Sequence, residues 1–125
     1  MIYGTGVDMV ETARIEAACA RQHFKTRVFT EEERRQAERR SERLAGDFAV
    51  KEAVAKAFGT GVSGFELHDI ACLRDEKGAP YVRLSGGAAA LAQKCGIKQI
   101  HVSISNTKTC VIAFAVLETE LQEEK

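Results

Sequence analysis

The stretch from residue 48 to residue 61 has the pattern of a helix that is covered by the rest of the protein. On a helical wheel at about 100° per residue, Ala, Val and Phe occupy almost every direction and no clean polar face exists. Only Lys51, Glu52 and Lys56 carry charge within this helix, and charges removed from water need partners. One interpretation is a Glu52–Lys56 pair with Lys51 extending toward solvent. The alternatives are a bound metal ion or an anionic ligand.

The residues before this helix predict one strand and two helices. Residues 2–8 form an expected short strand in which Gly4 and Gly6 permit close backbone approach and which delivers Asp8 at its end. A Rossmann fingerprint does not fit, because Met9 stands where the third glycine belongs. Asp8 could also cap a helix expected at about residues 12–21. Thr30 and Glu33 form a predicted capping box that opens a second helix through residue 43, whose charges we assign to a solvated face.

The second half of the chain predicts strands with one further helix. Residues 65–74 and 80–84 read as an antiparallel hairpin joined by a turn at residues 75–78, and residues 86–95 read as a small helix that ends at Gly96. Residues 99–106 alternate apolar and polar, whereas residues 109–117 are nearly all apolar and should lie in the centre of a sheet. Everything beyond Glu118 is acidic and is expected to fray.

Length and composition narrow the class of protein. The 125 residues, 45% hydrophobic and 29% charged, predict a single domain over residues 1–125 with a modest core. Because 18 basic and 18 acidic residues cancel, the charge balance favours neither nucleic acid nor a membrane surface as a partner. No apolar run has the length of a signal or a membrane span, so we expect a cytoplasmic protein. The four cysteines form no Cys-x-x-Cys and are expected to be reduced core residues.

Three separated charges suggest phosphate chemistry. Asp8, Glu52 and Lys56 together supply two hard oxygen ligands and a cation, which suits Mg²⁺ held by carboxylates and substrate phosphates. A second group of donors follows a strand near the C-terminus: Ser103, Ser105, Asn106, Thr107 and Lys108. Such donors fit a phosphorylated ligand, although Ser and Asn at a strand end are more often turn formers. The Gly59-Thr60-Gly61 sequence follows a helix, so it reads as a helix C-cap and not as a Walker loop.

Four sequence blocks carry a resemblance to a known family. They are Gly6-Val7-Asp8-Met9-Val10-Glu11, Phe29-Thr30-x-x-Glu33, the stretch 48–61, and Val102-Ser103-Ile104-Ser105. In this order and spacing they resemble the holo-acyl-carrier-protein synthases, the small 4′-phosphopantetheinyl transferases. The resemblance implies an α+β fold, in which a small antiparallel sheet packs with helices, usually assembled as a trimer with active sites between subunits. It also implies Mg²⁺-dependent transfer of 4′-phosphopantetheine from coenzyme A to a serine of apo acyl carrier protein, in support of fatty acid biosynthesis, with release of adenosine 3′,5′-bisphosphate.

The resemblance also implies roles for individual residues. Asp8 and Glu52 would be the metal ligands, and Lys56 would stabilise charge on the pyrophosphate during transfer. Glu52 would also act in catalysis, by orienting a water that deprotonates the carrier serine. The residues implied to bind coenzyme A are Lys56, Gly59, Thr60, Gly61, Ser103, Ser105 and Asn106. Arg14 would dock the acidic carrier. Arg21 extends this basic strip as a second docking residue, followed by Lys25 and Arg27, or these three belong to an ordinary solvated face.

Two positions depart from the family pattern. Asn106 stands where a histidine is usual, and asparagine can donate to a phosphate but carries no charge near neutral pH. Asp47 stands where a basic residue is common. Neither departure removes the metal ligands. The alternative functions are a noncatalytic carrier-binding module, which would be indifferent to Mg²⁺, and another Mg²⁺-dependent nucleotide pyrophosphate enzyme, which would consume coenzyme A without a carrier.

Overall fold

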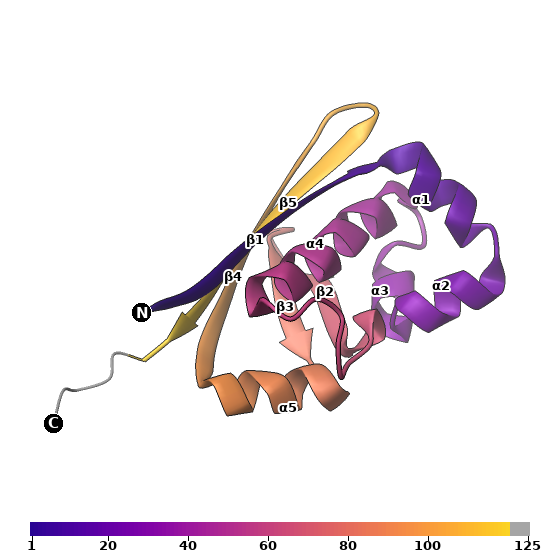
Figure 1. Ribbon diagram of the computed structural model, residues 1–125. Helices are drawn as coiled ribbons and strands as arrows, with labels where there is room; N and C mark the ends of the chain where they lie inside the picture. Colours follow the sequence, from indigo (N-terminus) through magenta and orange to yellow (C-terminus); the bar gives the residue numbers. More distant parts are fainter. Residues whose placement is uncertain (121–125) are drawn as a thin grey trace, which may run out of the picture.

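A three-stranded antiparallel sheet packed against one long helix forms the body of the protein (Figure 1). The computed structural model describes residues 1–120 of the chain. The sheet has the order β1-β5-β4, formed by β1 (Ile2–Glu11), β5 (Cys110–Thr119) and β4 (Ile97–Asn106). The apolar strand β5 is therefore central, as its composition predicted. The long helix α4 (Glu42–Phe58) lies across the face that Val111, Ala113, Ala115 and Leu117 of β5 turn inward.

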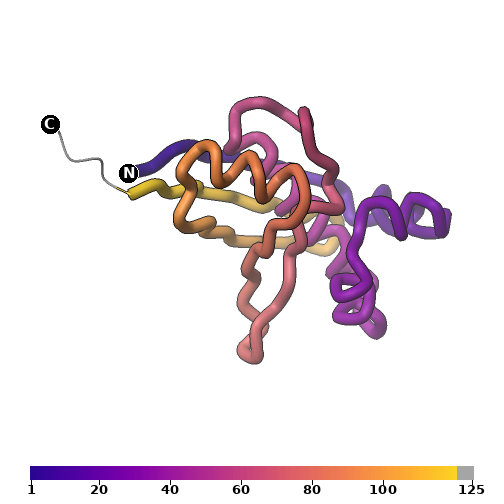
Figure 2. Tube along the Cα trace, turned by 90° about the horizontal axis from the view of Figure 1, so that it is seen from below, coloured from indigo at the N-terminus to yellow at the C-terminus, as the bar shows by residue number. Residues whose placement is uncertain are grey.

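A second sheet and shorter helices complete the fold. The strands β2 (Ile70–Arg74) and β3 (Pro80–Leu84) pair as an antiparallel hairpin, which projects from the body in Figure 2. The helices α1 (Thr12–Cys19), α2 (Gln22–Val28) and α3 (Glu31–Gln36) gather at one end of α4, and α5 (Gly86–Cys95) joins the hairpin to β4. The predicted α+β class with antiparallel pairing is confirmed. No helix within residues 1–120 is long and apolar enough to cross a membrane.

Two glycines explain why β1 lies so close to α4. A Cβ atom on Gly6 would stand 1.9 Å from the carbonyl oxygen of Ala53, and one on Gly4 would stand 2.1 Å from that of Ala57. Any larger residue would push the strand off the helix. The predicted close backbone approach is confirmed, and it brings Asp8 of β1 beside the C-terminal half of α4. The helix ends as predicted at Gly59, whose φ of 82° is the left-handed conformation of a helix C-cap.

Several predicted boundaries were wrong. Strand β1 continues to Glu11, so Asp8 lies within the strand, opposite Ala113, and caps no helix. The helix expected at residues 12–21 ends at Cys19. The helix expected at residues 30–43 ends at Gln36, and residues 37–41 separate it from α4, which begins at Glu42. Residues 67–69 form a 3₁₀ helix before β2, so no strand runs from residue 65.

The end of β5 and the burial of the cysteines also differ from the expectation. Thr119 is still part of β5 and its backbone N–H donates to the carbonyl oxygen of Met1 at 2.7 Å, so the chain does not fray directly after Glu118. The rest of the acidic tail, residues 121–125, lies outside the described residues. All four cysteines are free, as expected, but only Cys72 is buried and the other three are half-buried.

The charges of Lys51, Glu52 and Lys56 on α4 are arranged differently from the first interpretation. Lys51 is fully buried and donates to Glu33 Oε1 at 2.7 Å, so it does not extend toward solvent. Glu33 is likewise buried, and the predicted capping box with Thr30 is present. The face of α3 that carries Glu33 therefore points into the core and not into water. Lys56 pairs with Asp8 and not with Glu52.

Candidate functional site

Asp8 and Lys56 meet where β1 crosses the C-terminal half of α4. The Lys56 Nζ atom lies 3.0 Å from Asp8 Oδ1 and 3.0 Å from the carbonyl oxygen of Val7. The Asp8 side chain is 16% exposed and that of Lys56 is 54% exposed, so the ammonium group stands at the mouth of the site with the carboxylate behind it. The close packing of β1 on α4 produces this arrangement.

The other carboxylate oxygen of Asp8 is suited to bind a cation. Asp8 Oδ2 is buried and accepts no hydrogen bond from any group within residues 1–120. A buried carboxylate oxygen without a partner is costly, unless a ligand of opposite charge occupies the space beside it. Burial raises the pKa of Glu52, the negative charge of Asp8 raises it further, and Lys56 opposes the rise. Asp8 and Glu52 are thus neighbours that repel each other, and a shared cation would relieve the repulsion.

The donor set fits Mg²⁺ better than a metal held by the protein alone. Within the described chain, no three His, Cys, Asp or Glu side chains gather closely enough to hold an ion. Mg²⁺ is commonly bound by one or two carboxylates while water and substrate phosphates complete its octahedron. Asp8 and Glu52 can provide that pair of carboxylates, and the orphaned Asp8 Oδ2 is the position from which one ligand would come.

A groove lies along α1 and reaches Phe48 on α4. It has a volume of about 450 Å³ and is lined by Arg14, Ile15, Ala17, Ala18, Arg21, Phe24 and Phe48. The two arginines are exposed at its rim, and Phe48 lies one helical turn before Glu52 on α4. The structure thus brings Arg14 and Arg21 to one surface together with Phe48. Lys25 and Arg27, on α2, do not line this groove.

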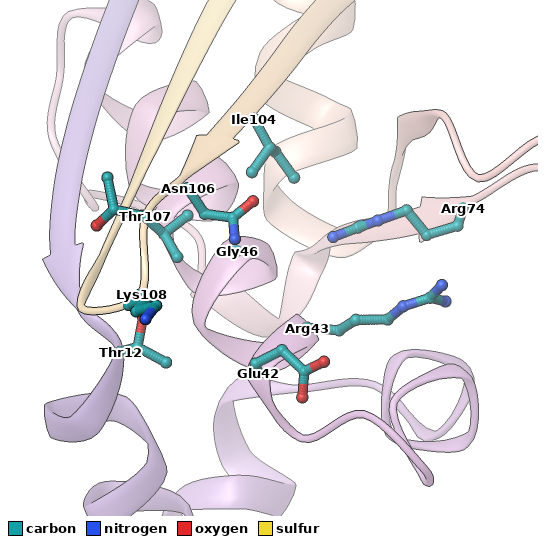
Figure 3. A pocket seen from close by; sticks show the side chains of 10 residues that line it. Thr12, Glu42, Arg43, Gly46, Arg74, Ile104, Asn106, Thr107 and Lys108 are labelled. Carbon is teal, nitrogen blue, oxygen red and sulfur yellow. The ribbon is translucent and has the colours of Figure 1, made fainter.

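A second pocket lies at the other edge of the sheet, between the β4–β5 turn and the N-terminal part of α4 (Figure 3). It encloses about 320 Å³ and contains Asn106, Thr107 and Lys108 of the turn region. The other lining residues are Thr12, Glu42, Arg43, Gly46, Arg74, Ile104 and Val111. Three basic side chains against one carboxylate make this an anion-binding pocket in composition.

Arg43 and Arg74 line this pocket but were not predicted from the sequence as binding residues. Arg74 ends an otherwise apolar strand, and Asp47, whose carboxylate lies 2.7 Å from the Arg74 guanidinium, follows the apolar stretch Leu44-Ala45-Gly46 of α4. Opposite charges in two apolar segments are a signal that they pair in the core, because neither could be buried alone. That signal was present in the sequence, but the sequence did not show which charged residues would pair with each other.

The remaining sequence-predicted residues fall into two separate places. Gly59, Thr60 and Gly61 are exposed and follow the end of α4 about one turn after Lys56. Ser103 and Ser105 are exposed on β4, on the face opposite to Ile104, which packs against the core. Within one chain, β5 separates the strand of Asp8 from the strand of Ser103, Ser105 and Asn106. The structure therefore does not bring these two sets of residues together in a single copy.

Comparisons with known proteins agree on one family. The model of the 4′-phosphopantetheinyl transferase superfamily matches residues 4–115. A holo-[acyl-carrier-protein] synthase of Lachnoclostridium phytofermentans is 45% identical over 118 residues, which cover 94% of this chain and 97% of that protein.

Solved structures give the same result for the fold. The holo-[acyl-carrier-protein] synthase of Neisseria meningitidis superimposes with a TM-score of 0.85 at 33% identity, covering 95% of this chain and all of that one. The holo-(acyl-carrier-protein) synthase of Bacillus anthracis, solved in complex with CoA (3′,5′-ADP), superimposes with a TM-score of 0.79 at 36% identity, covering 96% of this chain and 99% of that one.

Proposed function

This chain belongs to the 4′-phosphopantetheinyl transferase superfamily, and from that premise we propose that it transfers 4′-phosphopantetheine from coenzyme A to a serine of apo acyl carrier protein. The observation that carries the site assignment is the buried, unpartnered Asp8 Oδ2 beside Glu52 and Lys56. The named relatives match nearly the whole chain, which favours transfer over a noncatalytic carrier-binding module. The reaction would serve fatty acid biosynthesis in the cytoplasm, within a single transferase domain.

Mg²⁺ would be held by Asp8 and Glu52 together with the pyrophosphate of coenzyme A. A metal ion there would neutralise charge on the phosphoryl oxygens as the reaction proceeds. The partly exposed ammonium group of Lys56, held at the mouth of the site by Asp8, can turn toward the same pyrophosphate and stabilise the departing phosphate. The two carboxylates would thus hold the metal ion, and the ammonium group would stabilise the charge on the leaving phosphate.

In the reaction, the serine oxygen of the carrier would attack the β-phosphorus of coenzyme A. A new ester P–O bond forms while the bond from phosphorus to the bridging oxygen breaks, and the electron pair leaves with adenosine 3′,5′-bisphosphate. Glu52 would receive the serine proton through an intervening water molecule.

The carrier would dock on the groove of α1. Arg14 and Arg21 present positive charge around an apolar floor that contains Phe24 and Phe48. Such a surface suits an acidic helix with an apolar ridge, because the charges steer the encounter and the apolar contacts hold it. Since Phe48 lies one turn from Glu52, a carrier seated here would present its serine near the two carboxylates.

We further propose that the site is completed by a second copy in a homotrimer. The sheet face opposite α4 exposes Tyr3, Val7, Met9, Ile112 and Phe114, an apolar surface that a monomer would leave in water. Covering it with neighbouring copies would also allow the edge that carries Ser103, Ser105 and Asn106 to meet the Asp8 edge of the next copy. Coenzyme A would then be bound by Lys56, Gly59, Thr60 and Gly61 of one copy and by Asn106, Ser103 and Ser105 of another.

Intact-mass spectrometry of apo acyl carrier protein tests the function. Incubation with the protein, coenzyme A and Mg²⁺ should add one phosphopantetheine to each carrier, and chelation of Mg²⁺ should prevent the addition. An unchanged carrier mass in the presence of Mg²⁺ would refute the proposal. For the assembly, sedimentation should give a trimer, and Phe114→Lys should dissociate it because the substitution places charge in the apolar contact.

A further inference from the structure

Asp47 and Arg74 form an ion pair at the wall of the pocket in Figure 3. The Asp47 carboxylate on α4 accepts a hydrogen bond from Arg74 Nη1 at 2.7 Å, and the same nitrogen donates to Cys72 Sγ at 3.1 Å. The Asp47 side chain is 4% exposed and that of Arg74 is 12% exposed, so the guanidinium is held in place by a buried carboxylate. Burial raises the pKa of Asp47 to about 6, and Arg74 opposes the rise. At neutral pH the pair is therefore charged on both sides.

The backbone that carries Arg74 is fixed as well. Gln36, the last residue of α3, accepts from the Arg74 backbone N–H at 2.8 Å and donates to its carbonyl oxygen at 3.2 Å. The guanidinium passes over Gly46, where an added Cβ would stand 3.4 Å from Nη2. Three elements, α3, α4 and β2, thus determine where this side chain points. A charged group fixed before its ligand arrives loses little entropy on binding.

Part of the guanidinium remains available to a ligand. A guanidinium has five N–H donors in a planar fork. The contacts with Asp47 and Cys72 use Nη1 alone, and neither Nε nor Nη2 of Arg74 donates to another group within residues 1–120. Figure 3 shows the guanidinium pointing toward Asn106, whereas Glu42 and Arg43 turn away from that residue. Its free donors therefore face the pocket together with the Asn106 amide and Lys108.

The chemistry of the ligand follows from the proposed function, on which this inference rests. Coenzyme A carries a pyrophosphate and a separate phosphate monoester on its ribose. The pyrophosphate must lie at Asp8, Glu52 and Lys56, where the bond breaks. The ribose phosphate is the remaining anion, and a planar fork of free N–H donors is the geometry that recognises phosphate oxygens in pairs.

We propose that Arg74, positioned by Asp47, selects coenzyme A by binding its ribose 3′-phosphate, across the interface between two copies. Asp47 is a positioning residue in this arrangement, because it touches the guanidinium and not the phosphate. An acidic residue at position 47 thereby contributes to anion binding, through the arginine that it holds.

Steady-state kinetics with coenzyme A and 3′-dephospho-coenzyme A test the inference. In the wild type, KM should be lower for coenzyme A. Arg74→Gln should raise KM for coenzyme A about tenfold to a hundredfold, the usual range for losing hydrogen bonds to a charged group, and leave KM for the dephospho compound and both kcat values within about threefold. Asp47→Asn should raise KM for coenzyme A about threefold to tenfold.

Two further variants separate positioning from a general effect. Asp47→Asn introduced into Arg74→Gln should not change the preference for coenzyme A over 3′-dephospho-coenzyme A any further, since the guanidinium that Asp47 positions is already absent. This double variant also leaves no buried charge unpaired, so it should fold even if a single variant does not. Arg83→Gln removes an exposed arginine from the neighbouring strand of the same hairpin and should leave the preference unchanged.

The outcomes are distinct. Equal loss toward both substrates, or a loss confined to kcat, in Arg74→Gln would overturn the inference while the proposed function stands. Additive effects of the two substitutions would overturn the positioning role of Asp47. A wild type that fails to modify the carrier with either compound would instead refute the proposed function itself.

Discussion

Lys51 Nζ lies 2.7 Å from Glu33 Oε1, and both side chains are completely buried. The ammonium group also donates to the carbonyl oxygens of Leu67 at 3.1 Å and Ile70 at 2.6 Å, while Glu33 Oε2 accepts from the backbone N–H of Cys72 at 3.0 Å. One ion pair thereby ties together α3, α4, the 3₁₀ helix and β2. Because every partner is enclosed, the cost of desolvating the two charges is met by a complete set of hydrogen bonds.

Removing one member of this pair should destabilise the protein strongly. Lys51→Met leaves Glu33 buried without its cation, and a loss of about 3–5 kcal/mol in the free energy of unfolding is expected. Urea denaturation at neutral pH measures it. Arg35→Met, which breaks the exposed pair with Glu31, is the matched control and should cost less than about 1 kcal/mol. Equal effects of the two substitutions would show that the buried pair has no special role.

Asp8→Asn and Glu52→Gln should each reduce kcat by at least about a hundredfold with the fold intact. Each change preserves the size of the side chain and removes the charge that would bind Mg²⁺. Calorimetric titration should show weaker Mg²⁺ binding in both variants, and circular dichroism should match the wild type. Glu38→Gln removes an exposed carboxylate elsewhere and should leave both readouts unchanged. Wild-type Mg²⁺ affinity in the two variants would contradict the ligand assignment.

Arg14→Glu should raise KM for the carrier without changing KM for coenzyme A. Arg14 lines the groove proposed for docking, and reversal of its charge opposes an acidic partner. Added salt should shrink the difference from the wild type, since mobile ions screen exposed charges. Arg27→Glu makes the same change of charge on α2 outside the groove and serves as the control. Comparable losses in both variants would indicate attraction by overall charge and not by this groove.

Asp47 predicts a particular dependence of stability on pH. Its pKa is about 6 in the folded protein, raised by burial against the pull of Arg74, and near 3.8 when unfolded. Between these values the folded protein keeps a proton that the unfolded chain has lost, so this group favours folding most at low pH. The free energy of unfolding of the wild type, minus that of Asp47→Asn, should therefore fall from about pH 4 to pH 6 and stay constant above.

Denaturation of both proteins at several pH values gives that difference directly. A difference that instead rises with pH, mainly below pH 4, and is constant from pH 5 upward would mean that Arg74 outweighs burial and holds the pKa of Asp47 below its ordinary value.

Much of the fold could be predicted because local patterns agree with the tertiary structure. The apolar strand β5 is central, Gly59 and Gly96 end helices in the left-handed conformation, and Gly4 and Gly6 allow the contact of β1 with α4. Each of these depends on one segment and on a property of its own residues. The capping box of Thr30 and Glu33 is of the same kind.

The errors concern charges whose partners are distant in sequence. A helical wheel placed Lys51 near solvent, because nothing local reveals that Glu33 and two carbonyl oxygens enclose it. For the same reason Lys56 was paired with Glu52 on its own helix, although Asp8 of β1 holds it. The pocket around Arg74 depends on contacts among α3, α4 and β2, so it could be found only in the folded chain.

The most direct test of the account measures both products of one reaction. Apo acyl carrier protein, coenzyme A and Mg²⁺ are incubated with the protein, and the holo carrier and adenosine 3′,5′-bisphosphate are quantified in the same samples. The two products should form in equal amounts, and Glu52→Gln should form neither at a comparable rate. Release of the nucleotide without modification of the carrier would instead identify a pyrophosphate hydrolase and contradict the account.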